Sequence, residues 1–467
     1  MATWATIEAS EVANARRWDA DFFVNPYNTF LIELFARWGD WISLVGASER
    51  LTSGHTPLRH DVTQGDTPFI TVECVDPLAL NLEKAKRIWA HHARGELSRA
   101  RVRRGDVLIT IKRRIAISSA ILVEPGLMAV NQDVVVMTPK PAFRPGYVAA
   151  VLNSRIGQYQ ALRLATEQMN PYINVTALGQ LRIPLVSDRV QETIEEVVRE
   201  RLKFLDQSVN GYRRAEGELL NRMGWLHLKR HSVETSYVRN FADFATAGRA
   251  DAEFFQPQHT RLRDQLVKRG ATAVGAFCPR PARGVQPTLV EDGEVLVVDS
   301  KAVRPQGVEP ASTERTTRAF YDLSQSAKGR ILMGDVLLNS TGRGTLGRAA
   351  CYGLTAPALC DNHVAILRPD PEVCLPGYLS LFLNSPAGLE QSEQFQTGSS
   401  GQLEIYPEHI QQFLVYIPRR TSGAIDMVWQ EGLVAEIEAA VAAKAAARAR
   451  LTEANEMVEE ALTEAMG

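Results

Sequence analysis

The sequence predicts a mixed α/β (α+β) fold in which two similar, strand-rich domains stand in tandem and each is followed by a long helix. Three kinds of observation predict it. Short motifs occur twice at a nearly constant offset, short apolar runs lie between turn residues, and apolar positions recur at heptad spacing after each strand-rich part. The chain of 467 residues has room for several domains, and duplication favours two of roughly 170 residues each.

The duplication rests on five short motifs that appear in the same order in both halves. Arg17-Trp-Asp-Ala-Asp-Phe-Phe23 returns 232 residues later as Arg249-Ala-Asp-Ala-Glu-Phe-Phe255. The other pairs, at offsets of 229 to 231, are Gly54-His-Thr-Pro57 with Gly284-Val-Gln-Pro287, Gly105-Asp-Val-Leu108 with Gly334-Asp-Val-Leu337, Pro145-Gly-Tyr147 with Pro376-Gly-Tyr378, and Leu152-Asn-Ser154 with Leu383-Asn-Ser385. This period is far longer than that of solenoid repeats, so it indicates a duplicated domain.

Each copy is expected to contain short strands and only short helices. In the first copy the strands are expected at residues 69–72, 105–111, 116–122 and 134–137, with a short helix from Gly146 to Asn153. In the second copy they are expected at 295–298, 334–339, 349–352 and 364–367, with a helix from Gly377 to Asn384. Turn residues such as Gly54 and Pro57 bound these runs.

A long helix is predicted after each copy, at about residues 187–223 and 425–466. About 37 helical residues span roughly 55 Å, which is longer than one small core can cover. These helices must therefore pack on each other or on a partner, unless each lies alone over its own domain. The expected boundaries are 1–186 for the first domain, 187–224 for its helix, 225–247 for a connector, 248–420 for the second domain and 421–467 for its helix.

Charge is segregated along a chain whose net charge is only −2. Residues 81–114 contain 11 Lys and Arg against three acidic residues, whereas residues 425–467 contain nine acidic residues against three basic ones. This separation favours a polyanion on one face and a protein on another, although both stretches could simply be solvated surface. Five cysteines without a CxxC pair, no secretory signal and no long apolar run favour a cytoplasmic protein.

No catalytic or metal site is expected. Gly342-Arg-Gly-Thr-Leu-Gly347 has GxGxxG spacing, but a strand-like run follows it, so it is interpreted as a glycine-rich turn. Asn25-Pro-Tyr27 and Asn170-Pro-Tyr172 lack the second proline of the Asn-Pro-Pro-Tyr motif of adenine-N6 methyltransferases. His227 and His231 have the i, i+4 spacing of metal ligands on a helix, but no third ligand lies nearby in the sequence. The chain is therefore predicted to bind rather than to catalyse.

Nucleic acid is the ligand that the loops favour, because Arg and Lys bind phosphates while Arg, Asn and Gln pair with base edges. The alternative is that these loops are merely variable surface. The candidate DNA-binding residues are Lys112, Arg113, Arg114, Asn131, Gln132, Gln168 and Asn170 in the first copy, and Asn339, Ser340, Arg343, Arg348, Asn362, His363, Thr397 and Ser399 in the second. Asn131-Gln132 and Asn362-His363 are expected at equivalent positions.

Together these motifs resemble the specificity subunit of type I restriction-modification systems, the HsdS family. The resemblance covers nearly the whole chain and rests on the duplicated motifs and on Ile183-Pro184 and Ile417-Pro418 before the long helices. Two departures are Gln286, where the first copy has Thr56, and the alanine-rich second helix.

The resemblance implies two target-recognition domains whose helices pair as an antiparallel coiled coil. Each domain would read one half of a bipartite, asymmetric site in double-stranded DNA. Two methyltransferase subunits would dock on the helices and bind S-adenosylmethionine, and motor-nuclease subunits would be further partners. This chain would carry no cofactor and no catalytic residue.

Two other functions remain open from the sequence. One is a non-catalytic coiled-coil scaffold with two protein- or glycan-binding modules, for which binding would not weaken steeply with salt. The other is a methyltransferase with an unrecognised site, for which the isolated chain would bind S-adenosylmethionine and methylate DNA.

Overall fold

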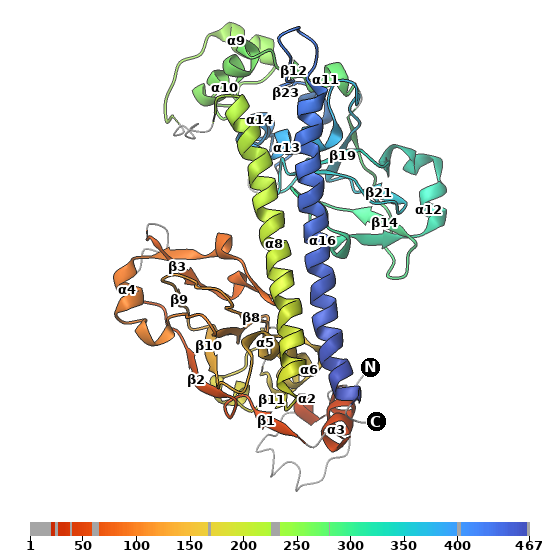
Figure 1. The fold of residues 1–467 in the computed structure, drawn as a ribbon. Helices are drawn as coiled ribbons and strands as arrows, with labels where there is room; N and C mark the ends of the chain where they lie inside the picture. Colours follow the sequence, from red (N-terminus) through yellow and green to blue (C-terminus); the bar gives the residue numbers. More distant parts are fainter. Residues whose placement is uncertain are drawn as a thin grey trace. The chain divides into compact units, whose positions relative to one another are not determined.

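The computed structural model describes residues 20–23, 27–37, 40–57, 65–166, 170–225, 234–279, 281–398 and 403–464 (Figure 1). They form two compact units. Unit 1 takes in the chain up to Asp206 and again from Lys444, and unit 2 takes in Gln207–Ala443. Each long helix therefore contributes one part to each unit. The five-part division into domains, helices and connector stays a prediction.

Unit 1 is built on two small sheets. The first has the order β2-β10-β7-β8 and is antiparallel throughout. The second has the order β6-β3-β9, in which β3 and β9 are parallel. The strands are β2 (Ser48–Ser53), β10 (Val134–Pro139), β7 (Val107–Thr110), β8 (Ser118–Ala120), β6 (Lys86–Ile88), β3 (Thr67–Ile70) and β9 (Ala129–Val130), with the small pairs β1 (Trp41–Ser43) with β11 (Arg182–Pro184) and β4 (Val75–Asp76) with β5 (Ala79–Leu80).

Unit 2 repeats this arrangement with one additional strand at the edge of its second sheet. Its first sheet is β13-β22-β19-β20 and its second is β17-β14-β21-β18, again with one parallel pair, β14 with β21. The strands are β13 (Ala282–Arg283), β22 (Val364–Leu367), β19 (Val336–Asn339), β20 (Ala349–Cys351), β17 (Glu314–Thr316), β14 (Val295–Val298), β21 (Ala358–Cys360) and β18 (Arg330–Ile331), with the small pairs β12 (Thr272–Ala273) with β23 (Leu414–Val415) and β15 (Val303–Arg304) with β16 (Gly307–Val308). The predicted duplicated, strand-rich fold is confirmed.

Apart from the two long helices, the helices of both units are short. Unit 1 contains α2 (Ala20–Phe23), α3 (Asn28–Arg37), α4 (Ala90–Arg94), α5 (Pro145–Asn153), α6 (Arg155–Leu164) and α7 (Val175–Leu178). Unit 2 contains α9 (Phe241–Ala247), α10 (Pro257–Lys268), α11 (Val274–Phe277), α12 (Arg318–Asp322), α13 (Pro376–Asn384), α14 (Pro386–Phe395) and α15 (Pro407–Ile410). The long helices are α8 (Asp188–Arg222) and α16 (Met427–Glu464), close to their predicted ranges. No helix among the described residues is apolar enough over a sufficient length to cross a membrane.

The core of unit 1 has a helical layer on one face of the first sheet and the second sheet on the other. Successive side chains of a strand point to opposite faces. Val107 and Ile109 of β7 pack in a cluster with Val151 of α5, whereas Leu108 packs with Ile70 and Val130 of the second sheet. Burial on both faces explains why β7 is a continuous apolar run rather than an alternating one. Complete burial of one such side chain contributes about 2 kcal/mol.

The repeated Gly-Asp turn is held by an ion pair in both units. Gly105 and Gly334 have φ values of 92° and 87°, which glycine adopts without a Cβ penalty. In unit 1 the buried carboxylate of Asp106 accepts hydrogen bonds from Arg50, at 2.6 Å, and from Thr138. In unit 2, Asp335 accepts from both Nε and Nη2 of Arg368, at 2.7 and 2.8 Å. The motif therefore recurs because it is structural.

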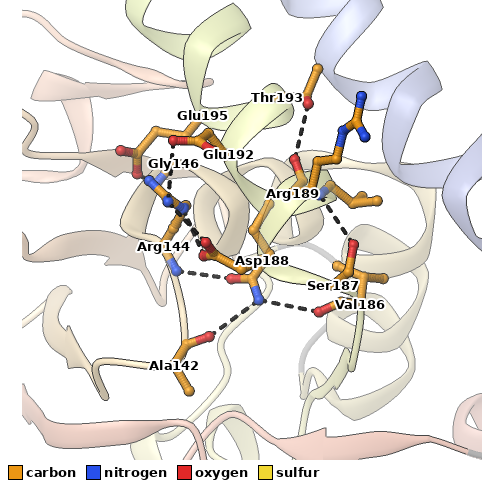
Figure 2. A network of polar contacts seen from close by, with 12 residues as sticks. Ala142, Arg144, Gly146, Val186, Ser187, Asp188, Arg189, Glu192, Thr193 and Glu195 are labelled. Carbon is orange, nitrogen blue, oxygen red and sulfur yellow. Dashed lines mark hydrogen bonds and ion pairs between the residues drawn. The ribbon is translucent and has the colours of Figure 1, made fainter.

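The repeated Pro-Gly-Tyr motif lets a long helix approach its own body closely (Figure 2). A Cβ added at Gly146 would lie 2.7 Å from Cγ of Glu195 on α8, whose Oε2 accepts a hydrogen bond from the Gly146 amide. Arg144 donates to both carboxylate oxygens of Asp188, in the first turn of α8. In unit 2 a Cβ at Gly377 would lie 3.1 Å from Val434 of α16.

A glutamine on each long helix makes an equivalent link to the loop before this motif. Gln191 of α8 accepts a hydrogen bond from the Arg144 amide and donates one to the carbonyl of Ala142. Gln430 of α16 accepts from the Leu375 amide and donates to the carbonyl of Val373. Each body is thus fixed to the first turns of the helix that follows it.

Within each unit, α8 and α16 pair antiparallel. In unit 2, Glu218 accepts a hydrogen bond from the indole of Trp429 at 2.7 Å, and Arg214, one turn earlier on α8, bonds to Glu436 at 3.3 Å. In unit 1, Nη1 of Arg201 donates to the carbonyl of Ala447, and Arg450 forms an ion pair with Glu200. In each unit the two long helices therefore pack on each other, and neither lies alone over its own body.

Candidate nucleic-acid interface

A polar pocket of about 240 Å³ opens in unit 1 beside the ends of β3, β7 and β9. We call it the corner pocket. It is lined by Thr56, Phe69, Thr71, Val72, Glu73, Lys86, Lys112, Arg113, Asn131, Gln132 and Asp133. Four of the residues predicted to bind DNA are therefore brought together here: Lys112, Arg113, Asn131 and Gln132.

The cationic side of the corner pocket is a strained loop that contains Lys112 and Arg113 and is hydrogen-bonded to a neighbouring segment. Arg113 has a φ of 63°, in the left-handed region that side chains other than glycine rarely adopt. Its amide donates to the carbonyl of Pro171 at 2.8 Å, and Lys112 forms a β-bridge with Tyr172. The segment from Asn170 to Tyr172 thus supports the loop, and Asn170 itself is exposed beside it.

The carboxylate of Glu73 lies opposite this loop. Its Oε1 is 3.2 Å from Nη1 of Arg113, whose side chain is 66% exposed. A hydrogen bond from Thr71, with smaller contributions from Arg113 and Lys86, lowers the pKa of Glu73, so the group is ionised at neutral pH. Because the Arg113 side chain is so exposed, this ion pair contributes little to stability. Arg113 can therefore leave Glu73 and bind another anion.

The amide wall is formed by Asn131 and Gln132, which have different roles. Asn131 is buried, and its Oδ1 accepts from the Asp133 amide at 3.1 Å, which closes a tight turn. Gln132 is exposed at the tip of that turn, and its Oε1 accepts a hydrogen bond from the hydroxyl of Thr56. Asn131 therefore shapes the turn and Gln132 is the residue presented to solvent.

Several lining residues were not among those predicted, notably Lys86, Thr56, Thr71 and Glu73. Lys86 lies on β6, next to Phe69 in the antiparallel register of β3 and β6. It falls within the basic stretch 81–114, so the charge pattern contained a signal for it. Arg114, which was predicted, lies outside the lining and forms an ion pair with Asp76 at 3.3 Å. Gln168 and Ser399 lie outside the described residues.

The corresponding corner of unit 2 corrects one predicted correspondence. Asn131 was expected to match Asn362, but the Asp361 amide bonds to the carbonyl of Val298 as the Asn131 amide does to Ile70. Asp361 also accepts from the amide two residues on, at 2.5 Å. Asn362 and His363 are therefore the counterparts of Gln132 and Asp133. The prediction was shifted by one residue because it matched the two asparagines by identity.

A second correction concerns Asn339 and Ser340, which were expected at an exposed hairpin tip. Both are completely buried, because β19 continues to Asn339 and the chain turns only afterwards. Nδ2 of Asn339 donates to the carbonyl of Ser300 at 3.0 Å. The exposed part of this hairpin begins later and includes Arg343, between glycines with φ values of 100° and 83°.

The remaining predicted residues of unit 2 occupy varied places. The ring of His363 bonds through Nδ1 to the hydroxyl of Thr341 at 2.8 Å. Thr397 is half-buried and exchanges two backbone hydrogen bonds with Glu404. Arg348 is half-buried just before β20.

The same corner differs in charge between the two units. Strand register and backbone bonds place Glu314 where unit 1 has Lys86, Thr341 where it has Lys112, and Gly342 where it has Arg113. Asp361 replaces Asn131, and burial raises the pKa of this carboxyl. One scaffold thus presents cations around a pocket in unit 1 and mainly acidic and neutral groups in unit 2.

Metal binding has no support in the part of the chain that the structure describes, where His, Cys, Asp and Glu nowhere gather in groups of three or more fit to hold an ion. The predicted pair His227 and His231 lies outside that part.

Comparison with known proteins finds similarity among solved structures. No family model matches the chain, and no curated protein sequence does. The chain is similar to the type I restriction-modification S subunit from M. genitalium, with 10% identity, a TM-score of 0.40 and coverage of 91% of this chain and 95% of that one. It is also similar to the HsdS subunit from Thermoanaerobacter tengcongensis, with 13% identity, a TM-score of 0.25 and coverage of 90% and 96%. A third structure, concerned with complex assembly and conformational transition of the type I R-M system, has 14% identity, a TM-score of 0.27 and coverage of 92% and 98%.

Proposed function

We propose that this chain is a non-catalytic DNA-sequence reader, the specificity subunit of a type I restriction-modification complex. Its target is a bipartite, asymmetric site in double-stranded DNA, of which each unit reads one half. The observation that carries the proposal is the repeated fold with unlike corners. The sheet strands of unit 1 recur in the same order in unit 2, which has one more, but Lys86, Lys112 and Arg113 have acidic or neutral counterparts. A protein that reads two different half-sites needs one scaffold with two sets of polar contacts.

The corner pocket has the chemistry of a base-reading site. Lys112 and Arg113 supply donors for phosphates or for guanine O6 and N7, and Gln132 supplies an amide of the kind that pairs with adenine. Glu73 and Asp133 supply acceptors suited to the cytosine amino group. Phe69 contributes an apolar side chain to the lining. A site for phosphate alone would not need the carboxylates.

The partners follow from what the chain does not supply. Methyltransferase subunits would bind S-adenosylmethionine and flip the adenine, and motor-nuclease subunits would complete the restriction complex. The acidic stretch 425–467 offers a protein-binding surface that DNA would avoid. In this account the chain itself binds no cofactor.

The test is the salt dependence of DNA binding by the full chain, alone and with its methyltransferase partner. Affinity for a duplex should fall linearly on a double-logarithmic plot as salt rises from about 50 to about 200 mM, because bound cations release counterions. If neither sample binds duplex DNA, the proposal is overturned. A salt-independent interaction with a protein or glycan would favour the scaffold function instead.

A further inference from the structure

Two arginines of unit 2 lie at the edge where the β15–β16 hairpin contacts β19 and β20. Arg304 is the last residue of β15, and Arg348 immediately precedes β20. Both are half-buried. Within the described ranges, neither guanidinium forms an ion pair or a side-chain hydrogen bond. Most other half-buried arginines of this unit do have such partners, as Arg249, Arg283 and Arg330 illustrate.

This arrangement opposes stability. Burial and then the neighbouring positive charge of Arg304 lower the pKa of Arg348. Two like charges on elements in contact, without an acidic partner, lose hydration and repel each other. A fold retains such a pair at a cost, and the cost is removed when an anion binds between the two groups.

Unit 1 shows that the fold itself does not require cations at this edge. In the β4–β5 hairpin, Asp76 has the register position that Arg304 has in β15–β16. The position of Arg348 is taken by Ile117, since the amides of Thr110 and Asn339 bond to the carbonyls of Ile117 and Arg348 respectively. Asp76 is neutralised there by Lys84 and Arg114, each at 3.3 Å. The same edge is thus paired in unit 1 and unpaired in unit 2.

We propose that Arg304 and Arg348 together bind a phosphate of the DNA backbone, an inference that rests on the proposed function. Guanidinium groups match phosphate oxygens with paired hydrogen bonds and remain charged when partly desolvated. Unit 2 needs cations at another place than unit 1, because its corner has Glu314, Thr341 and Gly342 in place of three cations. The arginine pair supplies them.

The experiment is a salt titration of the full chain with a pool of duplexes of random sequence, since phosphate contacts are sequence-independent. The variant is Arg304→Gln with Arg348→Gln. Loss of one phosphate contact makes the negative slope of log K against log salt less steep by about 0.9. The advantage of the natural protein should therefore shrink about 3.5-fold between about 50 and about 200 mM salt.

A matched control removes the same charge from paired sites of the same unit. Arg261 is bonded to Glu234 and Arg318 to Asp322. Arg261→Gln with Arg318→Gln should leave the slope unchanged, and an equal loss in this control would overturn the inference by showing that net charge alone matters.

Thermal unfolding gives a second readout that a merely structural pair would move the other way. Arg304→Gln with Arg348→Gln should keep or raise the Tm, because repulsion is removed. A lower Tm, or an unchanged salt slope in a variant of a protein that does bind DNA, would overturn the phosphate site alone. If the natural protein binds no duplex, the proposed function fails and the phosphate site fails with it.

Discussion

Arg113 stands in a left-handed backbone conformation at the rim of the corner pocket, with φ of 63°. Its counterpart in unit 2, Gly342, has φ of 100°. The fold therefore accepts glycine at this turn, and an arginine there costs about 1 kcal/mol of strain. Such strain is reasonable where the side chain contacts a ligand, and it makes stability and binding separable at this residue.

Replacement of Arg113 by glycine should thus leave the free energy of unfolding equal or raise it by up to about 1 kcal/mol. The same variant should bind duplex DNA more weakly, and its log K should fall less steeply with log salt, by about 0.9 in slope. Urea unfolding and DNA titration of one preparation measure both. A loss of stability would contradict the strain account, and unchanged affinity would remove Arg113 from the interface.

A wider loss is expected when Lys112 and Arg113 are both replaced by alanine. Both side chains are exposed, so folding should be little affected, whereas binding should weaken at moderate salt in the presence of the methyltransferase partner. Arg114→Ala is the matched control, because Arg114 is paired with Asp76 outside the pocket lining. Equal effects of the pair and of the control would show that the pocket has no special part.

The positions of single residues were also the least predictable from the sequence. Lys112 and Gln132 could be found because polar residues at turn positions between apolar runs are exposed. Asn339 and Ser340 were expected to be exposed, although the strand was predicted to reach Asn339, because polar type alone does not show that side chains at the end of a strand are buried. Lys86 was overlooked because it lies on a strand far from the loop it faces across the pocket.

At the scale of helices and strands, close approach of each long helix to its own body depends on small side chains. Gly146→Ala would bring a Cβ to 2.7 Å from the Glu195 side chain and should destabilise the protein by roughly 1–3 kcal/mol. Gly217→Ala on α8 meets nothing within 4 Å and should instead stabilise by up to about 1 kcal/mol. Urea unfolding of the two variants measures this difference, and equal effects would contradict it.

A carboxyl group on α8 gives the stability of the protein a pH dependence. Burial raises the pKa of Glu216 from its usual 4.5, so its ionisation opposes folding. Its contribution to stability is present below about pH 4.5 and is lost as pH rises through the higher folded-state pKa. Glu216→Gln should therefore stabilise the protein at pH 7 and have little effect near pH 4, as urea unfolding at both values would show. A larger gain at low pH would contradict this sign.

The helices were predictable from heptad spacing to within a few residues, but what they pack against was not. Periodicity identifies an apolar face, whereas the links through Gln191 and Gln430 join residues that are about 50 apart in the chain and of ordinary polar type. Apolar runs predicted β3, β7, β8 and β10 and their counterparts in unit 2, but not the partner strands β2, β6 and β9. The order of the strands in the sheets could not be derived from local patterns.

At the scale of the whole molecule, duplication was the strongest signal in the sequence, because motifs in constant order constrain the fold more than any one motif. It predicted two like bodies, and the sheet strands of unit 1 recur in the same order in unit 2. The functional consequence is modularity: if each unit reads its own half-site, one unit can be exchanged without changing what the other reads.

The most direct measurement is therefore the methylome of a host that carries this chain with its partner subunits, before and after residues 248–420 are exchanged for the equivalent domain of another reader. The account predicts a methylated motif split by an unread spacer, of which the exchange alters one half and leaves the other intact. An uninterrupted motif, no chain-dependent methylation, or a change in both halves would contradict it.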